Sequence, residues 1–354
     1  MKRCLALAVA LAVVAGCGGS GPTSALPARA ARATAPASNA ASASPTVAPT
    51  PVPTPVPTPT PVADVVSQVS LGRMWADLQA LCAVQSRDPR HPGHAKAVAY
   101  ILGQLQELAP LGVKVQVQPF TAEGIPMENI LAIVDPPGGA PATGGIVIGA
   151  HYDTIGKWTP GWRPAIDPAP GADDNGTGTA AVLEIARILA RERASLKERV
   201  VLGFWDGEEL YYKGTLAFVG ALQKPYAYSA FINPDTVGWN PIADRLDVLW
   251  WGSPSAALRD RVATANDRYA IGVKPLVNVL ADDPRVDLLD SAPFGMVGIP
   301  AVTLAERYGP PDATYPGSGT MDYATDTIDK IDNPRLWTKA AKLTLAVGLE
   351  LARR

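Results

Sequence analysis

Seven acidic side chains and one histidine of this chain share one kind of position. Each lies at, or shortly after, the end of a short apolar run such as "GIVIGA" or "RVVLGFW". Such runs are typical of strands covered on both faces, and open α/β sheets bind ligands outside the carboxyl ends of those strands. We therefore expect one polar edge that gathers His151, Asp153, Asp173, Asp174, Asp206, Glu208, Glu209 and Asp235.

Carboxylates combined with one imidazole suit zinc or another divalent cation. One zinc ion needs one histidine and two acids, and this chain offers more acids than that. A two-metal site with a bridging carboxylate is therefore our hypothesis, because two ions can polarise a carbonyl and activate a shared water. Such a site also needs a carboxylate that takes the proton from that water. The neighbours Glu208 and Glu209 could supply one ligand and one base.

The neighbours Asp173 and Asp174 pose an electrostatic problem. They lie in "PGADDNGTGTAAVLEIARIL", just before an apolar helical pattern that starts near Thr179. A helix N-terminus stabilises one negative charge, but two adjacent carboxylates repel each other. If either is buried, a metal ion or a basic side chain must hold it. The alternative is a solvated acidic turn.

Strand-like and helical patterns alternate along the folded part of the chain. "VKVQVQPF" alternates apolar and polar residues, as a half-buried strand does. Six further runs are short and mostly apolar: "NILAIVD", "GIVIGAHYD", "RVVLGFWD", "YSAFINPD", "LDVLWWG" and "IPAVTLAE". Helical patterns occur at about 92–108, 176–194, 213–222, 255–268 and 333–353. We predict an α/β fold, a mixed, mostly parallel twisted sheet with helices on both faces.

The first residues predict a targeting signal that is not part of the fold. Lys2 and Arg3 precede an apolar segment, Leu5 to Val14, that is too short to span a bilayer. "VVAGC" then places Cys17 after small residues, which resembles a bacterial lipobox, in which the cysteine is lipidated. We expect a lipoprotein signal peptide at 1–17, and an ordinary secretory signal is the alternative.

A spacer rich in proline, threonine and alanine follows. Its end, "TPVPTPVPTPTPV", has proline at every second or third position, which favours extended polyproline II. We expect a disordered tether over 18–66 and a folded domain over 67–354. An anchor, a spacer and a domain are a consistent design for an extracytoplasmic protein that is lipid-anchored to a bacterial membrane.

The charge of the folded part argues against nucleic-acid binding. The chain has 31 basic and 33 acidic residues, a formal net charge of −2. Four basic residues and no acidic ones precede Asp64, which leaves 27 against 33, or about −6. A nucleic-acid surface would need a basic stripe. Cys82 is the one cysteine beyond the tether, and its helical spacing with Leu78 and Leu81 predicts a core residue.

Several motifs together resemble the co-catalytic zinc aminopeptidases, the family of bacterial leucyl aminopeptidases and aminopeptidase Y. The motifs "AHYDT", "PGADDNGTGTAAVLEIAR", "FWDGEE", "NPDTVG", "GIPAVTL" and "DTIDKI" occur in the order seen in that family. The resemblance runs from about Met74 to the C-terminus. It implies a zinc-exopeptidase-like three-layer α/β/α fold, which glutaminyl cyclases share, and a zinc peptidase domain over 67–354.

The resemblance also implies a centre of two zinc ions. His151 would bind one ion, with Asp153 behind it to orient the imidazole. Asp173 would bridge the two ions, which would answer the repulsion in the acidic doublet. The family often has a cis peptide bond after the bridging aspartate, here Asp173–Asp174.

Three further residues follow from the resemblance, and a fourth departs from it. Glu208 would be the general base, Glu209 a ligand of the second ion, and Asp235 a ligand of the first. The family's last zinc ligand is a histidine four residues before the aspartate of "DT", and this chain has Asp322 there. A carboxylate is a legitimate zinc ligand, so we expect Asp322 to replace the histidine. If Asp322 is instead an exposed loop residue, one ion remains.

Other side chains are assigned to packing or left open. His91 and His94 lie where the family carries no ligand, and Ser291 stands where it often has a non-ligand histidine. Trp158 and Trp162, between His151 and the acidic doublet, either line a substrate pocket or pack the loop. The core is expected to contain Trp205, Trp250 and Trp251.

The leading hypothesis is a lipid-anchored zinc aminopeptidase that removes N-terminal residues from peptide substrates. A glutaminyl cyclase-like acyltransferase is the second, although those enzymes keep one zinc on residues matching Asp173, Glu209 and the missing histidine. A non-catalytic surface binding protein built on a decayed site is the third, and the intact Glu208 argues against it. The sequence does not define the preferred residue, the metal or the oligomeric state.

Overall fold

The computed structural model describes residues 58–139, 145–225, 227–280, 289–306 and 311–354. The predicted signal peptide, the proposed lipidation site at Cys17 and most of the predicted tether lie outside the described residues. Within the described ranges, no helix is long and apolar enough to cross a membrane.

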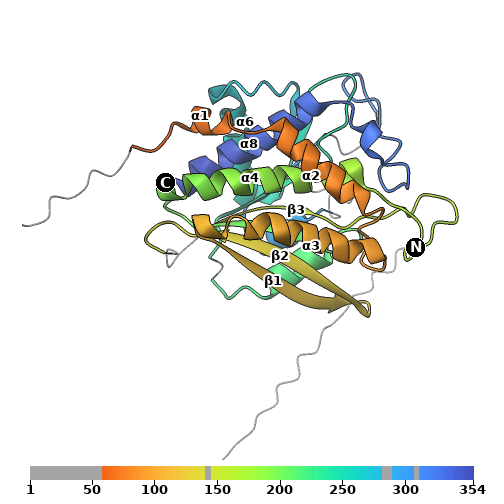
Figure 1. Cartoon of the computed structure of the whole chain (residues 1–354). Helices are drawn as coiled ribbons and strands as arrows, with labels where there is room; N and C mark the ends of the chain where they lie inside the picture. Colours follow the sequence, from red (N-terminus) through yellow and green to blue (C-terminus); the bar gives the residue numbers. More distant parts are fainter. Residues whose placement is uncertain (1–57, 140–144, 226, 281–288, 307–310) are drawn as a thin grey trace, which may run out of the picture. The chain divides into compact units, whose positions relative to one another are not determined.

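An eight-stranded mixed sheet forms the centre of the fold (Figure 1). Its strand order is β1-β2-β4-β3-β5-β8-β6-β7. The pairs β3–β4, β3–β5, β5–β8 and β6–β7 are parallel, and β1–β2, β2–β4 and β6–β8 are antiparallel. The predicted sheet is thus confirmed. The strands are β1 Val113–Ala122, β2 Ile125–Val134, β3 Ile146–His151, β4 Val200–Trp205, β5 Ala230–Pro234, β6 Leu246–Trp250, β7 Leu276–Leu280 and β8 Ala301–Ala305.

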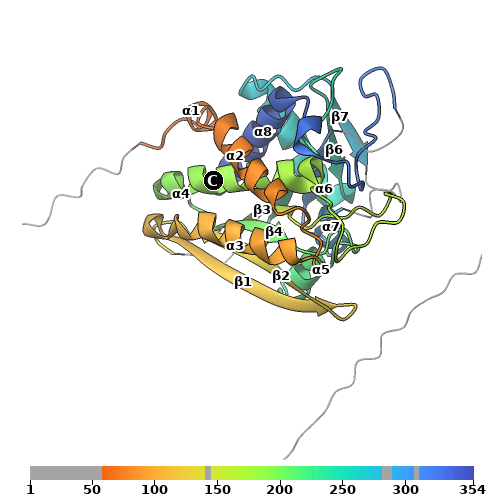
Figure 2. The ribbon, with the colours of Figure 1, turned by 45° about the vertical axis from the view of Figure 1, so that its right-hand side comes forward.

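Helices cover both faces of the sheet, because alternate residues of the central strands point to opposite faces and most are apolar. Ile146 and Ile148 of β3 pack in the larger core, whereas Val147 packs in the smaller one. Figures 1 and 2 show α2, α3, α4 and α8 on one side of the sheet. The helices of the larger core are α1 Val62–Val66, α2 Leu71–Ala83, α3 Pro92–Gln106, α4 Gly178–Glu192, α6 Gly252–Arg268 and α8 Pro334–Ala352, and those of the smaller are α5 Lys213–Gly220 and α7 Ser291–Met296.

Two elements differ from the sequence prediction. The helix expected from about residue 176 begins at Gly178, because the preceding turn, Ala172–Thr177, has non-helical backbone angles at Asp174 and Asn175. The edge strand β7 was not predicted, because its side chains are half-buried or exposed and give only a weak apolar pattern. Such an edge carries little of the periodic signal that identifies central strands.

The predicted boundary between tether and domain was placed too late. Residues Val62–Val66 form the short helix α1, inside the segment expected to be disordered. Val65 and Val66 are buried in the larger core, and α1 contacts α8. Burial of two valines outweighs the extended preference of the neighbouring prolines, so the folded part includes this helix.

Candidate metal centre

Three parallel strands bring the candidate side chains to one edge of the sheet. His151 is the last residue of β3, Glu208 and Glu209 follow β4, and Asp235 follows β5 directly. Because β4, β3 and β5 are parallel neighbours, their carboxyl ends lie side by side. They open into a pocket of about 340 Å³. Of the predicted site residues, those that line it are His151, Glu208, Glu209, Asp235 and Asp322.

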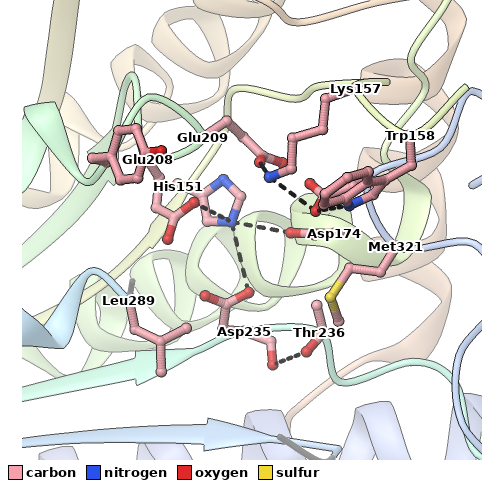
Figure 3. Close-up of a pocket in the computed structure, with 12 residues that line it drawn as sticks. His151, Lys157, Trp158, Asp174, Glu208, Glu209, Asp235, Thr236, Leu289 and Met321 are labelled. Carbon is pink, nitrogen blue, oxygen red and sulfur yellow. Dashed lines mark hydrogen bonds and ion pairs between the residues drawn. The ribbon is translucent and has the colours of Figure 1, made fainter. Parts of the chain in front are cut away.

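The imidazole of His151 is the centre of a converging group of acids (Figure 3). Its Nε2 atom lies 3.2 Å from Asp174 Oδ1, 3.6 Å from Asp235 Oδ1 and 3.9 Å from Glu208 Oε2. Ligand atoms bound tetrahedrally to one zinc ion are about 3.4 Å apart, given the usual bond lengths. The nitrogen of His151 and the oxygens of Asp174 and Asp235 therefore have the chemistry and spacing to hold one zinc ion.

The acidic residue in this cluster is Asp174, and the prediction that placed Asp173 there was one residue off. Asp174 lines the pocket, and the cis peptide bond is Asp174–Asn175, not Asp173–Asp174. The carboxylate of Asp173 accepts hydrogen bonds from the backbone N–H of Gly238 at 2.8 Å and the hydroxyl of Thr177 at 3.3 Å. Asp173 is thus a buried residue behind the pocket.

Burial gives Asp173 unusual acidity. Loss of solvent raises the pKa of Asp173 to about 7, although hydrogen bonds from neighbours act to lower it. Burial also raises the pKa of Glu306 well above its usual value, and the nearby Asp173 adds to the rise. The two carboxyls lie against each other, and sharing a proton removes their repulsion.

Long-range hydrogen bonds hold the turn that presents Asp174. The carboxylate of Asp326 accepts the backbone N–H of Asp173 at 3.1 Å and that of Asp174 at 2.9 Å. The buried guanidinium of Arg87 donates to the carbonyl of Gly171 at 2.9 Å. A side chain at Gly171 would place its Cβ 2.2 Å from Thr154 Cγ2, so only glycine fits. The turn is therefore fixed before any metal binds.

Asp153 supports both sides of the cluster. Its Oδ1 atom lies 3.4 Å from Nδ1 of His151, on the ring side away from the converging acids. The same carboxylate accepts the backbone N–H of Glu208 at 3.1 Å and that of Glu209 at 3.2 Å. One buried acid thus fixes the imidazole and the Glu208–Glu209 dipeptide together, as expected of a group behind a ligand.

The cluster carries more negative charge than its surroundings can neutralise. Burial raises the pKa of Glu208 well above its usual value, His151 opposes this, and Asp290 adds to it. For His151, burial acts to lower the pKa, but Glu208 and Asp235 outweigh it, and the pKa is raised well above its usual value. The Oδ2 atom of Asp290 has no hydrogen-bond partner among the described residues. A bound cation would relieve this excess of buried carboxylates.

Asp322 also lines the pocket, but its partners are basic and aromatic. Its Oδ2 atom accepts hydrogen bonds from Nζ of Lys157 at 2.9 Å and Nε1 of Trp158 at 2.9 Å. Lys157 Nζ lies 3.5 Å from Oε2 of Glu209. Burial acts to lower the pKa of Lys157, but Glu209 and Asp322 outweigh it and raise the pKa, so the side chain is an ammonium.

The pocket thus has two ends, for which we use fixed names. The histidine end consists of His151, Asp174 and Asp235, and the lysine end consists of Lys157, Glu209 and Asp322. Among the described residues, the donor atoms that converge on one point form two groups, His151–Glu208–Asp235 and His151–Asp174–Glu209. Asp322 belongs to neither group, so its role as a ligand stays a prediction.

Sequence reasoning did not identify Lys157, although this side chain lies in the pocket wall (Figure 3). It is one residue of a long loop with no periodic pattern, and its partners are distant in sequence. Trp158 lines the pocket and is 59% exposed. The indole of Trp162 packs on Gly156 and donates to the carbonyl of Pro168 at 3.2 Å. The two tryptophans therefore have one role each.

The remaining candidates lie away from the pocket. Asp206 follows β4 but pairs with Nε2 of His94 at 2.9 Å, and His91 accepts the backbone N–H of Gly93 at the start of α3. Cys82 is half-buried against the larger core, and burial raises the pKa of its thiol to about 11, which is inert. The hydroxyl of Ser291 is buried and accepts the indole N–H of Trp251 at 2.9 Å.

Comparisons with known proteins agree with this arrangement. A family model described as peptidase family M28 matches residues 129–347. Leucine aminopeptidase 1 of Pyrenophora tritici-repentis is 26% identical over 306 residues, which cover 82% of this chain and 73% of that protein.

Two solved structures show the same fold. The Legionella pneumophila LapA aminopeptidase has a TM-score of 0.67 at 18% identity and covers 83% of this chain and 75% of its own. A Bacteroides thetaiotaomicron glutaminyl cyclase bound to N-acetylhistamine has a TM-score of 0.63 at 18% identity, with coverages of 79% and 98%. At these identities the two structures establish the architecture only.

Proposed function

Because this chain belongs to peptidase family M28, we propose that it is a zinc aminopeptidase that hydrolyses the N-terminal bond of peptides. The family supports a metallopeptidase, and the similar proteins include leucine aminopeptidases. The observation that carries the proposal is the convergence of His151, Asp174 and Asp235 beside Glu208 in one pocket.

The histidine end would hold the zinc ion. His151 supplies Nε2, and Asp174 and Asp235 each supply an oxygen, a donor set that suits zinc. When bound, zinc would supply Lewis acidity for a substrate carbonyl and lower the pKa of water. Asp153 keeps the ring of His151 in place, because it lies at the Nδ1 side of the imidazole.

Glu208 is the proposed general base. Its carboxylate lines the pocket 3.9 Å from Nε2 of His151, while its backbone N–H is held by Asp153. It would accept a proton from the attacking water and deliver it to the leaving amine. Burial raises the pKa of Glu208, and a raised pKa favours a carboxyl that must both take up and release a proton near neutral pH.

The pocket wall gives a reason for exopeptidase specificity. Its volume, about 340 Å³, is at the low end for ligand pockets and suits one amino-acid residue rather than an extended chain. Apolar surface from Trp158, Leu289 and Met321 lines it beside the charged groups. We propose that this surface receives an apolar N-terminal side chain.

A direct assay tests the proposal. The purified chain should hydrolyse leucine p-nitroanilide, a chelator should abolish the hydrolysis, and added zinc should restore it. Release of ammonia from an N-terminal glutamine peptide, without hydrolysis of aminoacyl substrates, would instead identify a cyclase. Absence of both reactions in a zinc-loaded, folded protein would leave only the binding role.

We also propose that the enzyme is anchored outside the cytoplasm through a lipidated Cys17. The support is the sequence: a short apolar segment, the "VVAGC" motif and a proline-rich spacer ahead of the domain. Cys17→Ser should abolish incorporation of labelled palmitate and release the protein from membranes. Unchanged labelling in that variant would contradict the anchor, whereas the peptidase proposal would stand.

A further inference from the structure

Three carboxylates that a second metal ion would need already face a lysine. Lys157 Nζ lies 2.9 Å from Asp322 Oδ2 and 3.5 Å from Glu209 Oε2. Asp174, the acid shared between the two ends of the pocket, also acts on the Lys157 charge. Figure 3 shows the ammonium of Lys157 directed at Glu209, on the side of Asp174 away from Asp235.

Asp322 is already occupied at the lysine end. Both the ammonium of Lys157 and the indole N–H of Trp158 bond to its Oδ2 atom. The backbone N–H of Trp158 also bonds to the carbonyl of Asp322 at 3.1 Å, and Ala324 N–H bonds to Thr159 Oγ1 at 2.8 Å. These contacts join the two loops so that Lys157 and Asp322 meet.

The residues present do not fit a second ion. Zinc binds carboxylate oxygens at about 2.0–2.2 Å, so an ion held by Glu209 and Asp322 would be in contact with the ammonium already between them. The two cations would repel strongly in a buried site. Consistently, Asp322 is absent from the convergent groups among the described side chains.

We propose that the ammonium of Lys157 takes the place of the second metal ion, so that this chain binds a single zinc ion at the histidine end. The inference rests on the proposed zinc aminopeptidase. Lys157 supplies the positive charge that keeps Glu209 and Asp322 ionised at the pocket wall. The substituted histidine at position 322 and the lysine then form one change: a carboxylate that pairs with an ammonium replaces an imidazole that binds zinc.

Zinc stoichiometry tests the inference on the purified full chain. After equilibration with zinc and removal of free ions, elemental analysis should find one zinc per wild-type chain. Lys157→Met keeps the length of the side chain and removes its charge, so this variant should bind two. Its second ion should bind roughly a hundredfold more tightly than any second ion in the wild type, because a like charge is gone.

A matched control separates the lysine from general loss of charge. Lys114 pairs with Asp135 at 2.9 Å, far from the pocket, and Lys114→Met should leave one zinc per chain. The Lys157 side chain is 40% exposed, so its replacement should not unfold the protein, which circular dichroism checks. If Lys157→Met fails to fold, Glu209→Gln decides instead, because it should retain one zinc.

The outcomes distinguish this inference from the proposed function. Two zinc ions in the wild-type chain would overturn the lysine substitution and leave the aminopeptidase intact. One zinc in both wild type and a folded Lys157→Met variant would show that the lysine does not exclude the ion. No zinc and no hydrolysis in the wild type would overturn the proposed function itself.

Discussion

The two ends of the pocket use the same kind of acid differently. At the histidine end, Asp174 and Asp235 lie 3.2 and 3.6 Å from an imidazole nitrogen, which can donate an electron pair to a cation. At the lysine end, Glu209 and Asp322 lie 3.5 and 2.9 Å from an ammonium that is itself the cation. The difference teaches that a carboxylate's role is set by the group across from it.

The acidic doublet gives the same lesson within two adjacent residues. Asp174 points to the imidazole, whereas Asp173 points away to backbone N–H and hydroxyl donors. The comparison between the two ends can be broken or sharpened by four measurements, in order of decreasing effect.

The largest effect is expected from Asp174→Asn, set against Asp173→Asn. Loss of the Asp174 charge should empty the histidine end of zinc and lower turnover roughly ten-thousandfold. Asp173→Asn should retain zinc and stay within about tenfold of wild type, because an amide oxygen still accepts from Gly238. Elemental analysis and initial rates measure both. The reverse pattern would return the metal to Asp173.

Glu208→Gln should give the next largest effect. Turnover should fall by about a hundred- to ten-thousandfold, the usual contribution of a general base, while zinc content stays unchanged. Glu107→Gln, an exposed change outside the pocket, is the matched control and should behave like wild type. Near-normal turnover of the Glu208 variant would remove this residue from the mechanism.

Removal of zinc should destabilise the protein measurably. At a free concentration one hundred times the dissociation constant, a bound ion adds about 2.7 kcal/mol, or a melting-point shift of roughly 5–10 °C for a domain of this size. Chelation should reverse the shift, and His151→Ala should show no shift at all. Scanning fluorimetry with and without zinc makes the measurement. A full shift in the His151 variant would place the ion elsewhere.

Trp158→Phe should produce the smallest effect. It removes the indole N–H that bonds to Asp322 but keeps an apolar surface at the pocket wall. Loss of one partly exposed hydrogen bond, about 1 kcal/mol, should raise KM about fivefold and leave kcat within twofold. Leucine p-nitroanilide kinetics separate the two constants. A fall in kcat with unchanged KM would show that the indole acts in the reaction itself.

The sequence alone determined the architecture and most of the site. Continuous apolar runs identified the central strands, because a strand covered on both faces must be apolar throughout, and their ends located His151, Glu208, Glu209 and Asp235. The edge strand β7 and the helix α1 were missed, since neither has the burial on both sides that creates a clear pattern.

Only the tertiary structure decided which aspartate of the doublet faces the pocket and what Asp322 contacts. The orientation of Asp174 depends on Asp326, which lies 152 residues away, and that of Asp322 on Trp158, 164 residues away. Adjacent side chains point in different directions, so a shift of one residue exchanges a candidate ligand for a packing residue. Local sequence fixes residue types and elements, but contacts across such separations are set only when the sheet and its loops have folded.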